Sequence, residues 1–73
     1  MKNVMENGMV SYLEGKIALH KANYLTFVNN MTGVAEHGDY AETLLKELEE
    51  IAKYRELLEA LRYIQEEAPV YIT

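Results

Sequence analysis

The stretch that decides the fold is VSYLEGKIALHKANYLTFVNNM, residues 10–31. Large side chains recur through it at alternating spacings of three and four, a coiled-coil-like pattern formed by Val10, Leu13, Ile17, His20, Tyr24, Phe27 and Met31. This spacing returns each side chain to the same side of an α-helix. Because no proline occurs before or within the stretch, we predict a helix over about residues 3–31 with one apolar stripe.

A break follows this helix. Residues 32–39, TGVAEHGD, contain two glycines, and Asp39 with Glu42 three residues later is typical of an N-terminal capping box. A second helix is predicted over about residues 40–67, ending before Pro69 because proline cannot continue the helical hydrogen bonds. Residues 68–73 are predicted to form a short tail of strand-prone side chains. The chain is therefore expected to be one all-α domain, a two-helix antiparallel hairpin.

The N-terminal residues admit another structure. Asn7-Gly8 is a frequent type I′ turn and would make residues 3–13 a β-hairpin. The flanking residues do not alternate between polar and apolar, and Met5 and Met9 favour helix. We therefore favour the helix.

The size of the chain indicates a need for association. A protein of 73 residues can bury only a small core, and such chains are usually supplemented by disulfides, metals or oligomerisation. The chain has no cysteine, which removes disulfides and the commonest structural zinc sites. We expect a homo-oligomer, with a dimer favoured, in which two hairpins form a four-helix bundle or a similar assembly.

A second row on the first helix consists of small residues at the same alternating spacing. It lies nearly opposite the large stripe and comprises Gly8, Ser11, Gly15, Ala18 and Ala22. Glycine inside a helix is about 1 kcal/mol less favourable than alanine, so the row predicts close approach of a neighbouring helix. The alternative is that small residues simply tolerate solvent here.

Apolar residues of the second helix change side along its length. One face carries Ala41, Leu44, Leu45, Leu48, Ile51 and Ala52, and another carries Tyr54, Leu57, Leu58, Leu61 and Ile64. We expect the two halves to meet different neighbours, the alternative being a bend or register change near Lys53. The predicted oligomer interface is therefore the small row together with Leu57, Leu61 and Ile64. Glu42 with Lys46, and Glu49 with Lys53, are expected to pair along the helix.

Charge and hydropathy exclude several classes of partner. The net charge of −5 disfavours binding to nucleic acids and to anionic membranes. No apolar run approaches the roughly 18 residues that span a bilayer, and the N-terminus lacks the apolar core of a secretory signal. We expect a cytoplasmic protein.

No arrangement of residues indicates catalysis, a cofactor or a metal. His20 lies within the apolar stripe, where we interpret it as a histidine satisfied by a core or interface hydrogen bond and not as a metal ligand. His37 lies beside Glu36 and Asp39, but capping and turn formation explain the same residues without a metal. No glutamate precedes a histidine at the Glu-x-x-His spacing of helical di-iron bundles. An enzyme is not expected.

Three short segments of the sequence resemble segments of a known group of proteins. Residues 3–8, NVMENG, residues 11–16, SYLEGK, and residues 33–39, GVAEHGD, are similar to short proteins of tailed bacteriophages. The similarity covers about the first 60 residues and brings no known activity. It implies a phage origin and a setting in the host-cell cytosol.

Three functional hypotheses follow. The first is a phage-encoded, homo-oligomeric module for protein–protein interaction. The second is an acidic nucleic-acid mimic that inhibits a host DNA-binding protein, using the carboxylates of Glu42, Glu47, Glu49, Glu50, Glu56, Glu59, Glu66 and Glu67. The third is a metal-dependent enzyme that uses the His37 loop.

Overall fold

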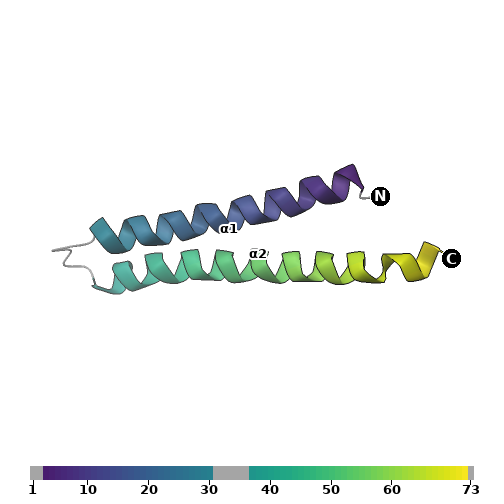
Figure 1. Cartoon of the computed structure of the whole chain (residues 1–73). Helices are drawn as coiled ribbons and strands as arrows, with labels where there is room; N and C mark the ends of the chain where they lie inside the picture. The colour runs from purple at the N-terminus through teal and green to yellow at the C-terminus, as the bar shows by residue number, and fades with distance from the viewer. Residues whose placement is uncertain (1–2, 31–36, 73) are drawn as a thin grey trace.

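The protein is a hairpin of two antiparallel helices, α1 (Val4–Asn30) and α2 (His37–Ile72), which lie side by side (Figure 1). The computed structural model describes the backbone of residues 3–30 and 37–72 and the side chains of residues 3–30 and 39–66. Its extents are 60 × 17 × 12 Å, and the smallest equals the diameter of one helix with its side chains. The predicted all-α hairpin is confirmed, and it is a single layer of helices.

Asn3 fixes the start of α1. Its Oδ1 accepts hydrogen bonds from the backbone N–H groups of Met5 at 2.7 Å and Glu6 at 3.4 Å. Its own carbonyl accepts the backbone N–H of Asn7 at 2.9 Å, which is the first bond of the helix. This is the geometry of an N-cap, in which a side-chain oxygen satisfies donors that have no partner within the helix. Asn7 and Gly8 both lie inside α1, so the β-hairpin alternative is wrong.

α2 is longer than the sequence predicts at both ends. It begins at His37, so Asp39 lies in its first turn, where a carboxylate is favourable beside the helix dipole, instead of capping from outside. It also continues through Pro69 to Ile72, and the predicted tail over residues 68–73 is wrong for residues 68–72. A helix that passes a proline loses one hydrogen bond while later residues still bond one turn back. Proline therefore disfavoured continuation without preventing it.

One stripe on each helix forms the interface between them. On α1 it follows the predicted residues, with Leu13 buried and Val10, Ile17, His20, Tyr24 and Phe27 half-buried; Met31 lies outside the described residues. On α2 it runs at alternating spacings of four and three through Tyr40, Leu44, Glu47, Ile51, Tyr54, Leu58, Leu61 and Gln65. We expected the two halves of α2 to meet different neighbours. This expectation is wrong for the contact with α1, because a single stripe of α2 faces α1 throughout.

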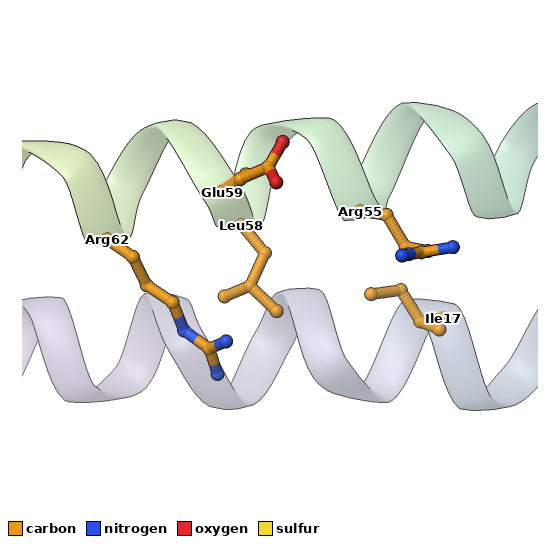
Figure 2. A pocket seen from close by; sticks show the side chains of 5 residues that line it. All are labelled: Ile17, Arg55, Leu58, Glu59 and Arg62. Atoms are coloured by element: carbon orange, nitrogen blue, oxygen red, sulfur yellow. The ribbon is translucent and has the colours of Figure 1, made fainter.

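The core inside this hairpin is small. Among the described residues, the buried apolar side chains are Leu13, 4% exposed, and Leu58, 9% exposed. Ile17 and Leu58 lie between the two helices, and Arg62 extends from α2 toward α1 (Figure 2). We call Leu13, Ile17 and Leu58 the leucine cluster. It lies in the half of the hairpin that contains the chain ends.

Candidate functional site

A cluster of polar side chains occupies the same interface nearer the loop. His20 Nδ1 lies 2.7 Å from Glu47 Oε1, and Asn23 donates from Nδ2 to the same oxygen at 3.4 Å. Both His20 and Glu47 have side chains only 16% exposed. Because a carboxylate only accepts hydrogen bonds, His20 must carry its proton on Nδ1. The interpretation of His20 as a histidine satisfied across the interface is confirmed.

Aromatic and cationic groups complete this polar cluster. The rings of His20 and Tyr54 are stacked, with centroids 6.0 Å apart and planes 11° from parallel. Lys16 Nζ lies 5.6 Å and Lys53 Nζ 4.7 Å from the centre of the Tyr54 ring, within the range of cation–π attraction. The polar cluster therefore comprises His20, Asn23, Glu47, Glu50, Lys53 and Tyr54, with Lys16 at its edge.

Glu50 and Lys53 form an ion pair at the solvent side of the cluster. Lys53 Nζ lies 3.0 Å from Glu50 Oε1, and this hydrogen bond holds the pKa of Glu50 below and the pKa of Lys53 above their ordinary values. Desolvation opposes both pKa shifts without reversing them. Lys53 thus pairs three residues back, and the expected pair with Glu49 is replaced by this one. The other expected pair, Glu42 with Lys46, is not formed among the described side chains.

The chemistry available to this cluster is that of a satisfied hydrogen-bond network. Glu47 is engaged by two donors, and His20 Nε2 lies 3.9 Å from Glu50 Oε1, which is longer than a hydrogen bond. Among the described residues, no group of three or more His, Asp or Glu side chains is placed to hold a metal ion. The side chains of Glu36 and His37 lie outside the described residues, so the His37 loop stays a prediction.

The two broad faces of the hairpin can be told apart by the contacts at their edges. Arg62 Nη2 bonds Glu14 Oε2 at 3.3 Å on one face, and Lys16 and Lys53 both approach the Tyr54 ring on the other. At 100° per residue, these contacts assign the exposed side chains on either flank of the helix–helix interface to one face or the other. We call them the Glu14 face and the Lys16 face.

Among the described residues, nine of the twelve large apolar side chains that are exposed gather in two patches, and Val4, Leu19 and Tyr63 lie outside them. The loop-end patch lies on the Glu14 face, close to the loop, and consists of Leu25, Val28, Leu45 and Leu48. The free-end patch lies on the Lys16 face, close to the chain ends, and consists of Met5, Met9, Tyr12, Leu57 and Ile64. Each patch draws residues from both helices. The hairpin therefore carries two separate apolar surfaces, on opposite faces and at opposite ends.

The residues predicted for the oligomer interface fall in three places. The small row, Gly8, Ser11, Gly15, Ala18 and Ala22, is exposed along the side of α1 that points away from α2. A Cβ added at Gly8 or Gly15 would meet nothing within 4 Å. Leu57 and Ile64 are exposed in the free-end patch, whereas Leu61 is half-buried against α1. The structure thus brings Leu57 and Ile64 together and leaves the small row on a different side.

The acidic residues of α2 do not form a uniform surface. Glu42, Glu49, Glu56, Glu59 and Glu66 are exposed, whereas Glu47 and Glu50 are held in the polar cluster. The side chain of Glu67 lies outside the described residues. Arg55 and Arg62 interrupt the exposed carboxylates along the groove shown in Figure 2.

Sequence reasoning missed the partners of these polar groups. The Asn3 cap is visible as Asn followed three residues later by Glu6, a helix-start pattern. The His20–Glu47 pair could also have been found, because residues at similar distances from the turn come level in an antiparallel hairpin. The Glu14–Arg62 pair does not follow from this rule, because Arg62 lies farther from the loop along α2 than Glu14 lies along α1.

Within the described residues, neither helix has a segment long and apolar enough to cross a membrane. No protein-family model matches the chain, and no curated protein or solved structure is significantly similar to it. The arrangement of its own residues is therefore what bears on its function.

Proposed function

We propose that this chain is a small, phage-encoded, homo-oligomeric module for protein–protein interaction, in which two hairpins pair to form a four-helix bundle or a similar dimer. The observation that carries the proposal is the single-layer hairpin with bare apolar surface on both faces. Stable domains are built from at least two packed layers, because each amphipathic element must bury its apolar side. One copy of this chain supplies only one layer.

The exposed area supports a second copy. The chain exposes 5904 Å², whereas a compact monomer of 8.4 kDa exposes about 4,600 Å². Two separate hairpins expose twice 5904 Å², and a compact particle of the doubled mass exposes about 7,700 Å². Forming such a particle would bury about 4,000 Å², which is the range of obligate homodimers.

The two apolar patches support further binding beyond one self-contact. Monomeric soluble proteins seldom expose contiguous apolar surface of this kind without a binding role. A symmetric pairing through one patch leaves the other patch free on each copy, available to a host or phage protein.

Sedimentation velocity at micromolar concentration tests the self-association. We expect a particle of twice 8.4 kDa. A well-folded species of 8.4 kDa across the accessible concentrations would contradict the proposal.

Replacing Gly15 with leucine tests the predicted role of the small row. If this row is buried between copies, the added side chain should weaken association, because tightly packed contacts do not accept extra volume. An unchanged dimer would remove the row from the interface and leave the self-association intact.

A pull-down from bacterial lysate tests the interaction with a further protein. The matched control is the Leu45→Glu, Leu48→Glu variant, which places charges in the loop-end patch. We expect specific capture by the wild-type chain and reduced capture by the variant. Equal recovery with both baits, or none above background, would count against a partner on this patch.

A further inference from the structure

We infer that a second copy of this chain docks on the free-end patch, so that Met5, Met9, Tyr12, Leu57 and Ile64 of one copy pack against the same residues of the other. The inference rests on the proposed self-association and names its surface. Two-fold pairing of one patch with itself closes after two copies and is the commonest form of homo-oligomer.

Exposure favours this patch over the other. Its five side chains are 48–81% exposed, whereas the four of the loop-end patch are 39–47% exposed. Apolar surface left in water is the surface whose burial stabilises an assembly, by about 25 cal/mol per Å². The free-end patch therefore gains more from being covered.

Continuity with the core favours it as well. Leu13 and Leu58, the buried apolar residues of the described part, lie level with the free-end patch, and Leu61 beside them is only half-buried. Covering the patch would join it to this leucine cluster in one continuous core. The loop-end patch instead lies level with the polar cluster around Glu47, where a larger apolar core would meet a carboxylate.

Charge distribution selects the face. At the level of the leucine cluster, the Glu14 face carries Glu14, Arg55, Glu59 and Arg62, of which Glu14 and Arg62 are paired with each other. The Lys16 face at the same level carries the free-end patch, with Lys16 Nζ 5.9 Å from the Tyr12 ring centre at its edge. An apolar centre with a charged rim is the usual anatomy of an interface.

The decisive variant is Leu57→Glu, Ile64→Glu, and its matched control is Leu45→Glu, Leu48→Glu. Both change two similarly exposed apolar residues on α2 and add the same charge. We expect the dissociation constant of the dimer to rise by more than about tenfold in the first variant, because a buried, unpaired carboxylate opposes association. The control should stay close to wild type, with circular dichroism reporting retained helix in both.

The outcomes separate this inference from the proposed function. A monomeric wild type overturns both. A dimeric wild type whose two variants stay dimeric, or whose control alone dissociates, overturns the free-end patch and leaves self-association standing. Dissociation of the Leu57→Glu, Ile64→Glu variant alone supports the patch.

A second measurement covers the case in which the charged variant fails to fold. The chain has no cysteine, so a single introduced thiol reports only on its own position. We expect Met9→Cys to be cross-linked into dimers by a short bis-maleimide, and Leu45→Cys to stay uncross-linked at the same concentration. Cross-linking of Leu45→Cys alone would overturn the inference.

Discussion

The leucine cluster and the polar cluster are two parts of one interface that perform different tasks. Both use the stripe at alternating spacings of three and four, yet one places Leu13 and Leu58 between the helices and the other places His20 and Glu47 there. Apolar burial is favourable in any register that covers the side chains. A hydrogen bond of 2.7 Å between two largely buried groups forms in one register only. The first cluster therefore supplies stability and the second supplies specificity, as single polar residues do in coiled coils.

Truncating the leucine cluster should have the largest effect. We expect Leu58→Ala to lower the free energy of unfolding by about 2–5 kcal/mol, because it removes buried methyl groups and leaves a cavity. Urea unfolding at fixed protein concentration measures the change. Leu45→Ala, on an exposed site, is the control, and equal losses in both would show that Leu58 is not the centre of the core.

Breaking the polar cluster should cost less. Glu47→Ala leaves His20 without its acceptor and should lower the free energy of unfolding by about 1–3 kcal/mol. The double variant His20→Leu, Glu47→Leu should recover most of that loss, since an apolar pair often replaces a buried polar pair without penalty. If the double variant also keeps one register, shown by a single set of NMR resonances, the specificity role of the polar cluster is wrong.

The polar contact beside the leucine cluster should contribute less to the free energy of unfolding than the polar cluster does. Arg62 and Glu14 are joined at 3.3 Å but their side chains are 57% and 54% exposed. Arg62→Ala should change the free energy of unfolding by less than about 1 kcal/mol, as exposed ion pairs generally do. Parallel urea titrations of the two variants measure the difference. If Arg62→Ala loses as much stability as Glu47→Ala, the degree of burial does not decide how much each contact stabilises the fold.

The Glu50–Lys53 pair should give the smallest signal, visible only in the dependence of stability on pH. Because the pKa of Glu50 is lowered in the folded protein, the pair adds stability at pH values above the ordinary pKa of 4.5. This stability is lost as the pH falls through the pKa of the folded state. Because the pKa of Lys53 is raised in the folded protein, the pair adds stability at pH values below the ordinary pKa of 10.5. This stability is lost as the pH rises through the pKa of the folded state. Lys53→Met should flatten both edges of a melting-temperature profile. Unchanged edges would show that the pair contributes nothing.

The sequence predicts the parts of this molecule that depend on local pattern. The spacing of residues 10–31 predicts the stripe of α1, and the glycines after residue 31 predict where the chain turns. The end of α2 is less predictable, because Pro69 disfavours a helix by a finite amount that neighbouring turns can offset. The polar cluster was not predicted, because in the sequence Glu47 is one of many glutamates in an acidic segment. Its role becomes visible only when the fold places His20 opposite it. The structure was also needed to tell which apolar residues of α2 face α1 and which lie exposed on either side of that stripe.

The hairpin topology also sets an order of events during folding. The bonds of His20 and Asn23 to Glu47 close segments of 27 and 24 residues, whereas the Arg62–Glu14 bond closes one of 48. Closing the longer segment costs about 0.5 kcal/mol more chain entropy, and contacts between residues close in sequence form sooner. We therefore expect the network near the turn to form before the leucines meet, so that the two helices pair outward from it already in register.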